Sequence, residues 1–147
     1  MKKILFTFIS ILAVYSAFSQ NNKDFNQFLT VLAKVESSGK TNAFNKSENA
    51  IGIYQIRPDY FKDAQKQNKQ LSLLSHRDCY NPEVAKLVVK SYMERYCKTN
   101  NFETWAKSHN GGGRYYLNRN KKFNSNLEIY WRKFQKNSWL LFNLWYS

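Results

Sequence analysis

The fold is decided by one stretch, Phe25-Asn26-Gln27-Phe28-Leu29-Thr30-Val31-Leu32-Ala33-Lys34-Val35-Glu36-Ser37-Ser38-Gly39. Its apolar residues recur at helical spacing, which predicts an amphipathic helix. At about 100° per residue, Glu36 falls in one strip with Phe25, Leu29 and Leu32. A carboxylate therefore stands where the pattern favours an apolar side chain. The Ser-Ser-Gly that follows predicts the end of the helix, with Gly39 as its left-handed closing residue.

Two effects favour the protonated form of the Glu36 carboxyl. It lies at the C-terminal, negative end of the predicted helix dipole, and its strip neighbours are apolar. Both effects disfavour the ionised carboxylate, so we expect a raised pKa, which is what a general acid requires. The alternative is a structural glutamate that is hydrogen-bonded at a helix end.

Residues 1–19 have the pattern of a secretion signal. Lys2 and Lys3 precede a mostly apolar run, residues 4–18, and Ala17-Phe18-Ser19 offers a cleavage site after Ser19. The run is short for a membrane span, although an uncleaved anchor is the alternative. We therefore expect a secreted or periplasmic protein, with residues 20–147 as a single domain and no stable membrane span after cleavage.

The chain is strongly basic, with a formal net charge of +13. Such a balance often indicates nucleic-acid binding, but the export signal argues against a nucleic-acid partner. We interpret the charge as attraction to anionic cell-surface polymers, with plain solubility as the alternative. Aromatic residues make up 17% of the chain, which suits a compact domain with a surface that stacks on sugars. We expect a monomer.

The chain contains two cysteines, Cys79 and Cys97. In an oxidising compartment a disulfide between them would stabilise the fold by roughly 3 kcal/mol on the chain-entropy model. Two free buried thiols are the alternative. Two Cys and two His, scattered along the chain, do not form the pattern of a metal site, and we expect neither a metal nor a cofactor.

Local signals predict a mostly α-helical α+β protein. Helices are expected at 58–67, where Pro58 suits a first turn, at 82–97, after the cap Asn81, at 102–108, and from Ser125, where a capping-box spacing begins. Residues 45–56 favour a short strand or hairpin, and the glycine run in 109–113 predicts a loop. The apolar tail, 139–146, is expected to pack on the core; contact with a partner or a membrane is the alternative.

Five segments, in order and at similar spacings, resemble one family. They are Val35–Gly39, Gly52–Ile56, Ser91–Tyr96, His109–Gly112 and Tyr130–Lys133. Together they look like the lysozyme-like superfamily, and most closely like its invertebrate-type (destabilase) lysozymes, over about residues 32–135. Lytic transglycosylases share the ancestral pattern, but their third motif usually has tyrosine where this chain has His109. The chain departs from the invertebrate type in having only two cysteines, since that family is normally rich in disulfides.

The resemblance implies a lysozyme-like fold, with a helical body and a small β element flanking a cleft. It also implies a peptidoglycan glycosidase, a muramidase that cleaves the β-1,4 bond between N-acetylmuramic acid and N-acetylglucosamine with Glu36 as general acid. Two alternatives stay open. One is a lytic transglycosylase that forms 1,6-anhydro products, and the other is a non-catalytic module that binds peptidoglycan strands on the same fold.

The second catalytic carboxylate is less clear than the first. In the invertebrate-type pattern an aspartate precedes the second segment, and its ungapped counterpart here is Asn45, which cannot act as a nucleophile. Glu48 is the only acid between Glu36 and Gly52, and it would take the role if the loop is shortened. The alternative is that Glu48 is a solvated loop acid and that Glu36 works without a carboxylate partner.

The remaining motif residues are predicted to contact substrate. Each has a structural alternative: core packing for the tyrosines, and a purely structural role for the histidine. The predicted substrate-binding residues are Tyr54, Gln55, His109, Asn110, Gly111 and Tyr130.

Overall fold

The computed structural model describes residues 23–97, 101–113 and 125–143. The chain divides into two compact units, Met1–Thr30 and Val31–Ser147, and every residue that forms the site lies in the second. The predicted signal peptide lies outside the described residues and stays a prediction. In the described part of the chain, no helix is long and apolar enough to cross a membrane.

The first described helix covers residues 23–37 and ends where the sequence indicated. Gly39 has a positive φ of 82°, as predicted, and Ser38 also has a positive φ, 56°, which the sequence did not indicate. Two backbone bonds close the end, from Ser38 N to the Lys34 carbonyl and from Gly39 N to the Ala33 carbonyl. Leu32 is fully buried and Glu36 largely so, which confirms the predicted strip for this part of the helix.

The β element is a hairpin of two short antiparallel strands, β1 (Phe44–Asn45) and β2 (Ala50–Ile51). Ile51 makes a further bridge to Ile56, so the backbone turns back on itself across Gly52. A Cβ at Gly52 would lie 2.2 Å from the Cys79 carbonyl oxygen, so only glycine allows the hairpin to approach the next segment this closely. The predicted β element therefore exists, but with less regular strand than the composition suggested.

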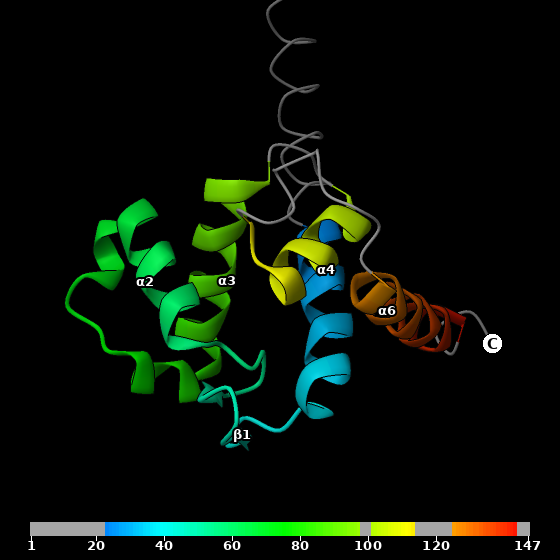
Figure 1. Ribbon diagram of the computed structural model, residues 1–147, viewed down its shortest axis with the longest axis horizontal. Helices are drawn as coiled ribbons and strands as arrows, with labels where there is room; N and C mark the ends of the chain where they lie inside the picture. Colours follow the sequence, from blue (N-terminus) through cyan, green and yellow to red (C-terminus); the bar gives the residue numbers. More distant parts are fainter. Residues whose placement is uncertain (1–22, 98–100, 114–124, 144–147) are drawn as a thin grey trace, which may run out of the picture. The chain divides into compact units, whose positions relative to one another are not determined.

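Two helices form the body beside the hairpin. Helix α2 (Pro58–Gln67) leads through the short 3₁₀ helices η1 (Lys69–Leu71) and η2 (His76–Tyr80) to α3 (Pro82–Tyr96). The caps work as the sequence predicted, because Pro58 opens α2 and the Asn81 side chain accepts a hydrogen bond from Glu83 N at the start of α3. Helices α2 and α3 lie side by side (Figure 1), and their contact buries Tyr60, Ala64, Val88 and Tyr92.

Helix α4 (Phe102–Gly111) contacts both α3 and α6 (Ser125–Asn143) (Figure 1). The prediction of a loop at 109–113 is wrong for its first three residues, since His109, Asn110 and Gly111 complete the last turn of α4. Packing explains the difference. A Cβ at Gly111 would lie 2.7 Å from Leu127 Cδ2, so glycine lets α4 approach α6 closely enough to offset its poor helix propensity.

The predicted disulfide is wrong. Cys79 and Cys97 are both free thiols, the first buried and the second partly so. They lie at opposite ends of α3, whose 15 residues rise about 22 Å along the helix axis. A disulfide needs Cα atoms within about 7 Å of each other, so this helix keeps the two thiols apart. The architecture is otherwise the expected one, a mostly α-helical α+β fold with a small β element.

Candidate active site

Glu36 lies in the last turn of the first described helix, and its side chain is only 17% exposed. Burial raises the pKa of its carboxyl above the usual range. Three neighbours act the other way on that pKa: the Tyr130 hydroxyl through a hydrogen bond, and the charges of Lys133 and Arg57. The desolvation effect is the larger, so Glu36 holds its proton to a higher pH than an exposed glutamate does.

Helix α6 supplies the nearest partner of this carboxyl. The Tyr130 hydroxyl donates a hydrogen bond to Glu36 Oε1 at 2.5 Å, and among the described residues no hydrogen bond reaches Oε2. Burial raises the pKa of Tyr130 well above its usual range, so its hydroxyl remains a donor. One turn further along α6, Lys133 Nζ donates to the Val35 carbonyl at 2.8 Å and so satisfies an otherwise orphan carbonyl at the helix end.

His109 is buried beside Glu36 and is neutral. Burial, assisted by the charge of Arg57, lowers its pKa to about 3. Its Nε2 lies 2.9 Å from the Tyr54 carbonyl oxygen, which can only accept, so Nε2 carries the hydrogen. Its Nδ1 then accepts from the Tyr60 hydroxyl at 3.2 Å. Because the ring is neutral, its 3.9 Å approach to Glu36 Oε1 is not an ion pair at neutral pH.

Arg57 is a site residue that the sequence analysis missed. Its Nη2 donates to the carbonyls of His109, at 3.1 Å, and Asn110, at 2.9 Å. A cation at the C-terminal end of α4 is favourable because it satisfies orphan carbonyls and opposes the helix dipole. The available signal was its place directly after the Gly52–Ile56 segment and before Pro58, which made it the first cation beyond a predicted substrate-binding motif.

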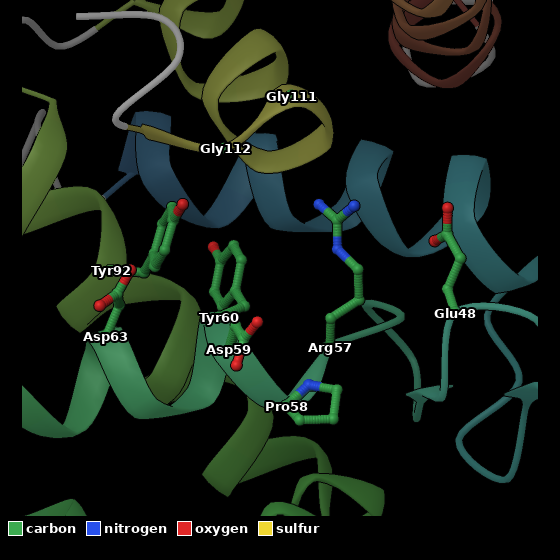
Figure 2. Close-up of a pocket in the computed structure, with 9 residues that line it drawn as sticks. All are labelled: Glu48, Arg57, Pro58, Asp59, Tyr60, Asp63, Tyr92, Gly111 and Gly112. Atoms are coloured by element: carbon green, nitrogen blue, oxygen red, sulfur yellow. The ribbon is translucent and has the colours of Figure 1, made fainter.

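A pocket of about 480 Å³ opens next to these residues. Figure 2 shows Arg57 between Glu48 on one side and the side-by-side rings of Tyr60 and Tyr92 on the other, with Gly111 and Gly112 on the segment above it. The two tyrosine rings are stacked, with centroids 3.5 Å apart. The pocket is lined by Glu48, Arg57, Pro58, Asp59, Tyr60, Asp63, Tyr92, Gly111 and Gly112.

Glu36 does not line this pocket itself, but it is connected to it. His109 contacts Tyr60 through Nδ1, and Tyr60 is a pocket residue. Arg57 and Glu48, which also line the pocket, both act electrostatically on the Glu36 carboxyl, Arg57 lowering its pKa and Glu48 raising it. The buried acid and the open pocket are therefore parts of one arrangement.

The structure separates the two candidates for a second carboxylate position. Glu48 is exposed in the turn between β1 and β2, lines the pocket and faces the Glu36 charge. Asn45 is exposed as well, but its Oδ1 accepts from the backbone N–H and the hydroxyl of Ser47 and so serves the hairpin turn. Glu48 is thus a solvated loop acid and also the one of the three pocket acids, with Asp59 and Asp63, that raises the pKa of Glu36.

The other predicted substrate contacts are mostly engaged within the protein. Tyr54 is buried and contributes its carbonyl to His109, which agrees with the core-packing alternative. The Gln55 amide donates to the Gly52 carbonyl at 2.9 Å and holds its own turn. Asn110 offers its carbonyl to Arg57, and Gly111 is the one member of the set that lines the pocket.

The site brings its acids together without a metal-binding arrangement. Within the described ranges, no group of three or more His, Cys, Asp or Glu side chains is placed to hold a metal ion. The arrangement instead suits proton transfer, since it holds a protonated carboxyl beside a pocket, with a hydroxyl and cations ready to stabilise the carboxylate that remains.

Comparison with known proteins identifies the family. A family model described as Destabilase matches residues 26–137, which include every site residue named above. Comparison with curated proteins gave no match, and neither did comparison with solved structures. Because the matched region covers well over half of the chain, the protein belongs to the Destabilase family, and membership implies a lysozyme-like glycosidase activity.

Proposed function

We propose that this protein is a muramidase that cleaves the β-1,4 bond between N-acetylmuramic acid and N-acetylglucosamine in peptidoglycan, with Glu36 as general acid. One observation carries the proposal: a largely buried glutamate with a raised pKa sits beside a pocket, in a chain of a lysozyme-like family. A glycosidase needs such a protonated carboxyl at neutral pH to protonate the leaving oxygen.

Tyr130 decides which oxygen of Glu36 carries the proton. Its hydroxyl donates to Oε1, so that oxygen acts as an acceptor and the acidic hydrogen belongs on Oε2. In the reaction Oε2 gives its proton to the glycosidic oxygen as the bond from that oxygen to the sugar C1 breaks. The carboxylate left behind is stabilised by the Tyr130 hydrogen bond and by the charges of Lys133 and Arg57.

Glu48 is our candidate for the second carboxylate. It lines the pocket from the β1–β2 turn and is close enough to Glu36 to act on its pKa. From the solvated side it would stabilise the positive charge that develops at C1, or activate the water that completes hydrolysis. The division of environments supports these roles, since Glu36 is buried and keeps its proton, whereas Glu48 is exposed to solvent.

The test is a product analysis of digested peptidoglycan by mass spectrometry. We expect soluble fragments with reducing muramic acid ends from the wild type, and none from Glu36→Gln. Glu94→Gln is the matched control, because Glu94 is a half-exposed acid on α3, away from the pocket residues. Fragments one water lighter would instead identify a lytic transglycosylase, and binding to the wall without release would identify a non-catalytic module.

The export of the protein is part of this proposal and has its own test. A muramidase reaches peptidoglycan only outside the cytoplasmic membrane, so the predicted signal at residues 1–19 should be removed. N-terminal sequencing of the exported protein should begin at Gln20, directly after Ser19. A mature protein that still begins at Met1 would contradict this part of the proposal.

A further inference from the structure

The second half of α6 leaves the core of the protein. Phe134 is fully buried, but none of the described residues after it in this helix is buried. Large apolar side chains are nevertheless exposed on it: Trp139 is 65% exposed and Leu140 is 43% exposed. Ile129, in the first half of the helix, is 65% exposed as well. Exposed apolar groups gathered on one element indicate a surface that binds something.

These side chains share one face with two cations. Ile129, Arg132, Lys136 and Leu140 are spaced at three, four and four residues, which places them along one stripe of a helix. Trp139 lies beside that stripe, about 100° from Leu140. Arg132 and Lys136 are exposed, and neither has an ion pair within the described residues. We call these five residues the outer face of α6.

The outer face carries no acid. The one acid in α6 is Glu128, which lies four residues before Arg132, about 40° from it around the helix and at the edge of the outer face. Its carboxylate pairs with Lys107 of α4, so it belongs to the contact between the two helices. The outer face therefore presents positive charge and apolar area together, on a chain whose formal net charge is +13.

The combination of positive charge and apolar area indicates which kind of partner the outer face binds. A soluble polyanion would be attracted by Arg132 and Lys136, and its sugars or bases can stack on the tryptophan, but it offers no apolar region to the exposed isoleucine and leucine. An anionic bilayer surface matches both features, because its headgroups attract the cations and its interfacial region takes up apolar and aromatic side chains. The helix would lie along the surface, with its exposed face against the headgroups.

We propose that the outer face of α6 docks the protein on anionic phospholipid membranes. This function is separate from the proposed cleavage of peptidoglycan. Tyr130 contacts Glu36 from the buried side of α6, about 100° around the helix from Ile129, whereas Lys133 borders the outer face and reaches the Val35 carbonyl through its Nζ. The membrane would hold the enzyme near its surface while the pocket stays available to glycan.

The test is co-sedimentation of the full chain with large unilamellar vesicles. One set contains phosphatidylglycerol and phosphatidylcholine in equal parts, and the other contains phosphatidylcholine alone. All variants keep the same N-terminal residues, so differences between them report on α6. We expect binding to the anionic vesicles, a loss of roughly tenfold or more in the partition coefficient for Trp139→Ser/Leu140→Ser, and a loss of roughly 25-fold for Arg132→Gln/Lys136→Gln.

Two matched controls accompany these variants. Leu73→Ser removes a leucine that is 96% exposed but lies outside α6. Lys40→Gln/Lys69→Gln removes two exposed lysines elsewhere on the second unit. Both controls should bind within about twofold of the wild type. The α6 variants should keep wild-type thermal unfolding and should cleave soluble glycan fragments at the wild-type rate.

Three outcomes would overturn the proposal. In the first, the wild type does not bind anionic vesicles, or the controls lose as much binding as the α6 variants. In the second, Trp139→Ser/Leu140→Ser binds like the wild type while inorganic polyphosphate displaces both, which would make the face a polyanion site. In the third, light scattering shows a dimer that the same variant dissociates, which would make the outer face a contact between two copies of the chain.

Discussion

Replacing Tyr130 by phenylalanine should make Glu36 a weaker acid. The change removes the hydroxyl that donates to Oε1 at 2.5 Å and leaves the ring in its buried position. That bond favours the ionised carboxylate, and hydrogen bonds to charged groups contribute about 1.5–3 kcal/mol. Since 1.36 kcal/mol corresponds to one pH unit, losing it should raise the pKa at which Glu36 ionises.

The assay is the pH dependence of kcat/KM on a soluble peptidoglycan fragment. Because the general acid must be protonated, activity falls on the alkaline side as Glu36 ionises. We expect this alkaline limb to move by about one pH unit or more toward higher pH in Tyr130→Phe, with a lower maximum because the product carboxylate is less stabilised. Lys133, Arg57, His109 and Glu48, which also face Glu36, are unchanged by the substitution.

Tyr80→Phe provides the control, since Tyr80 is a partly exposed tyrosine that does not line the pocket. It should leave both the limb and the maximum unchanged. A limb that stays in place in Tyr130→Phe, or moves toward lower pH, would refute the reasoning. Loss of rate alone is not enough to support it, because a merely structural disturbance lowers the rate without moving the limb upward.

Other predictions follow from the same contacts. The pKa of Glu36 is raised above its unfolded value of 4.5, so the wild type loses stability as the pH rises past that value. Glu36→Gln keeps an acceptor for the Tyr130 hydroxyl but has no charge to bury. Its melting temperature relative to wild type should therefore be higher at pH 7 than at pH 4. The pKa of His109 is lowered from 6.5 to about 3, so the unfolded chain binds the proton first, and wild-type stability should fall as pH drops from 6.5 toward 3; the melting temperature of His109→Gln should change less across this window. Gly113→Ala places a Cβ 2.2 Å from Tyr96 Cγ and should destabilise by about 1–3 kcal/mol in denaturant unfolding, whereas Gly39→Ala, with open space around its Cβ, should show only the backbone strain of its positive φ. Alkylation of the unfolded, unreduced chain should label both Cys79 and Cys97, and a label that appears only after reduction would contradict their separation by α3.

The sequence predicted those parts of the fold that local chemistry controls. The starts of α2 and α3 follow from Pro58 and from Asn81-Pro82, whose effects on the backbone do not depend on the rest of the molecule. The end of the first described helix follows in the same way from Ser38 and Gly39. The sequence also indicated the family correctly, because five short segments in the right order carry more information than any one of them.

The errors arise where tertiary packing overrides local preference. The glycine run predicted a loop, but Gly111 stays helical because its bare Cα lets Leu127 approach. The disulfide was predicted from the oxidising compartment and the number of residues between the two cysteines. Most of those residues form the straight helix α3, which keeps the two thiols apart in space. Arg57 was missed because its partners are backbone carbonyls of α4, and a sequence does not show which carbonyls a side chain will reach.

The candidate site also has one part that the sequence predicted and another that depends on tertiary packing. The sequence revealed that Glu36 lies on the buried strip of its own helix, and burial is what raises its pKa. The groups that limit this effect come from elsewhere: Tyr130 is 94 residues away along the chain, and Arg57 and Lys133 belong to two other elements. Burial favours the protonated carboxyl, and the distant groups favour the carboxylate. The strength of the acid is therefore a property of the packed fold, and substitutions of Tyr130 or Lys133 in α6 should change it without altering Glu36 or its helix.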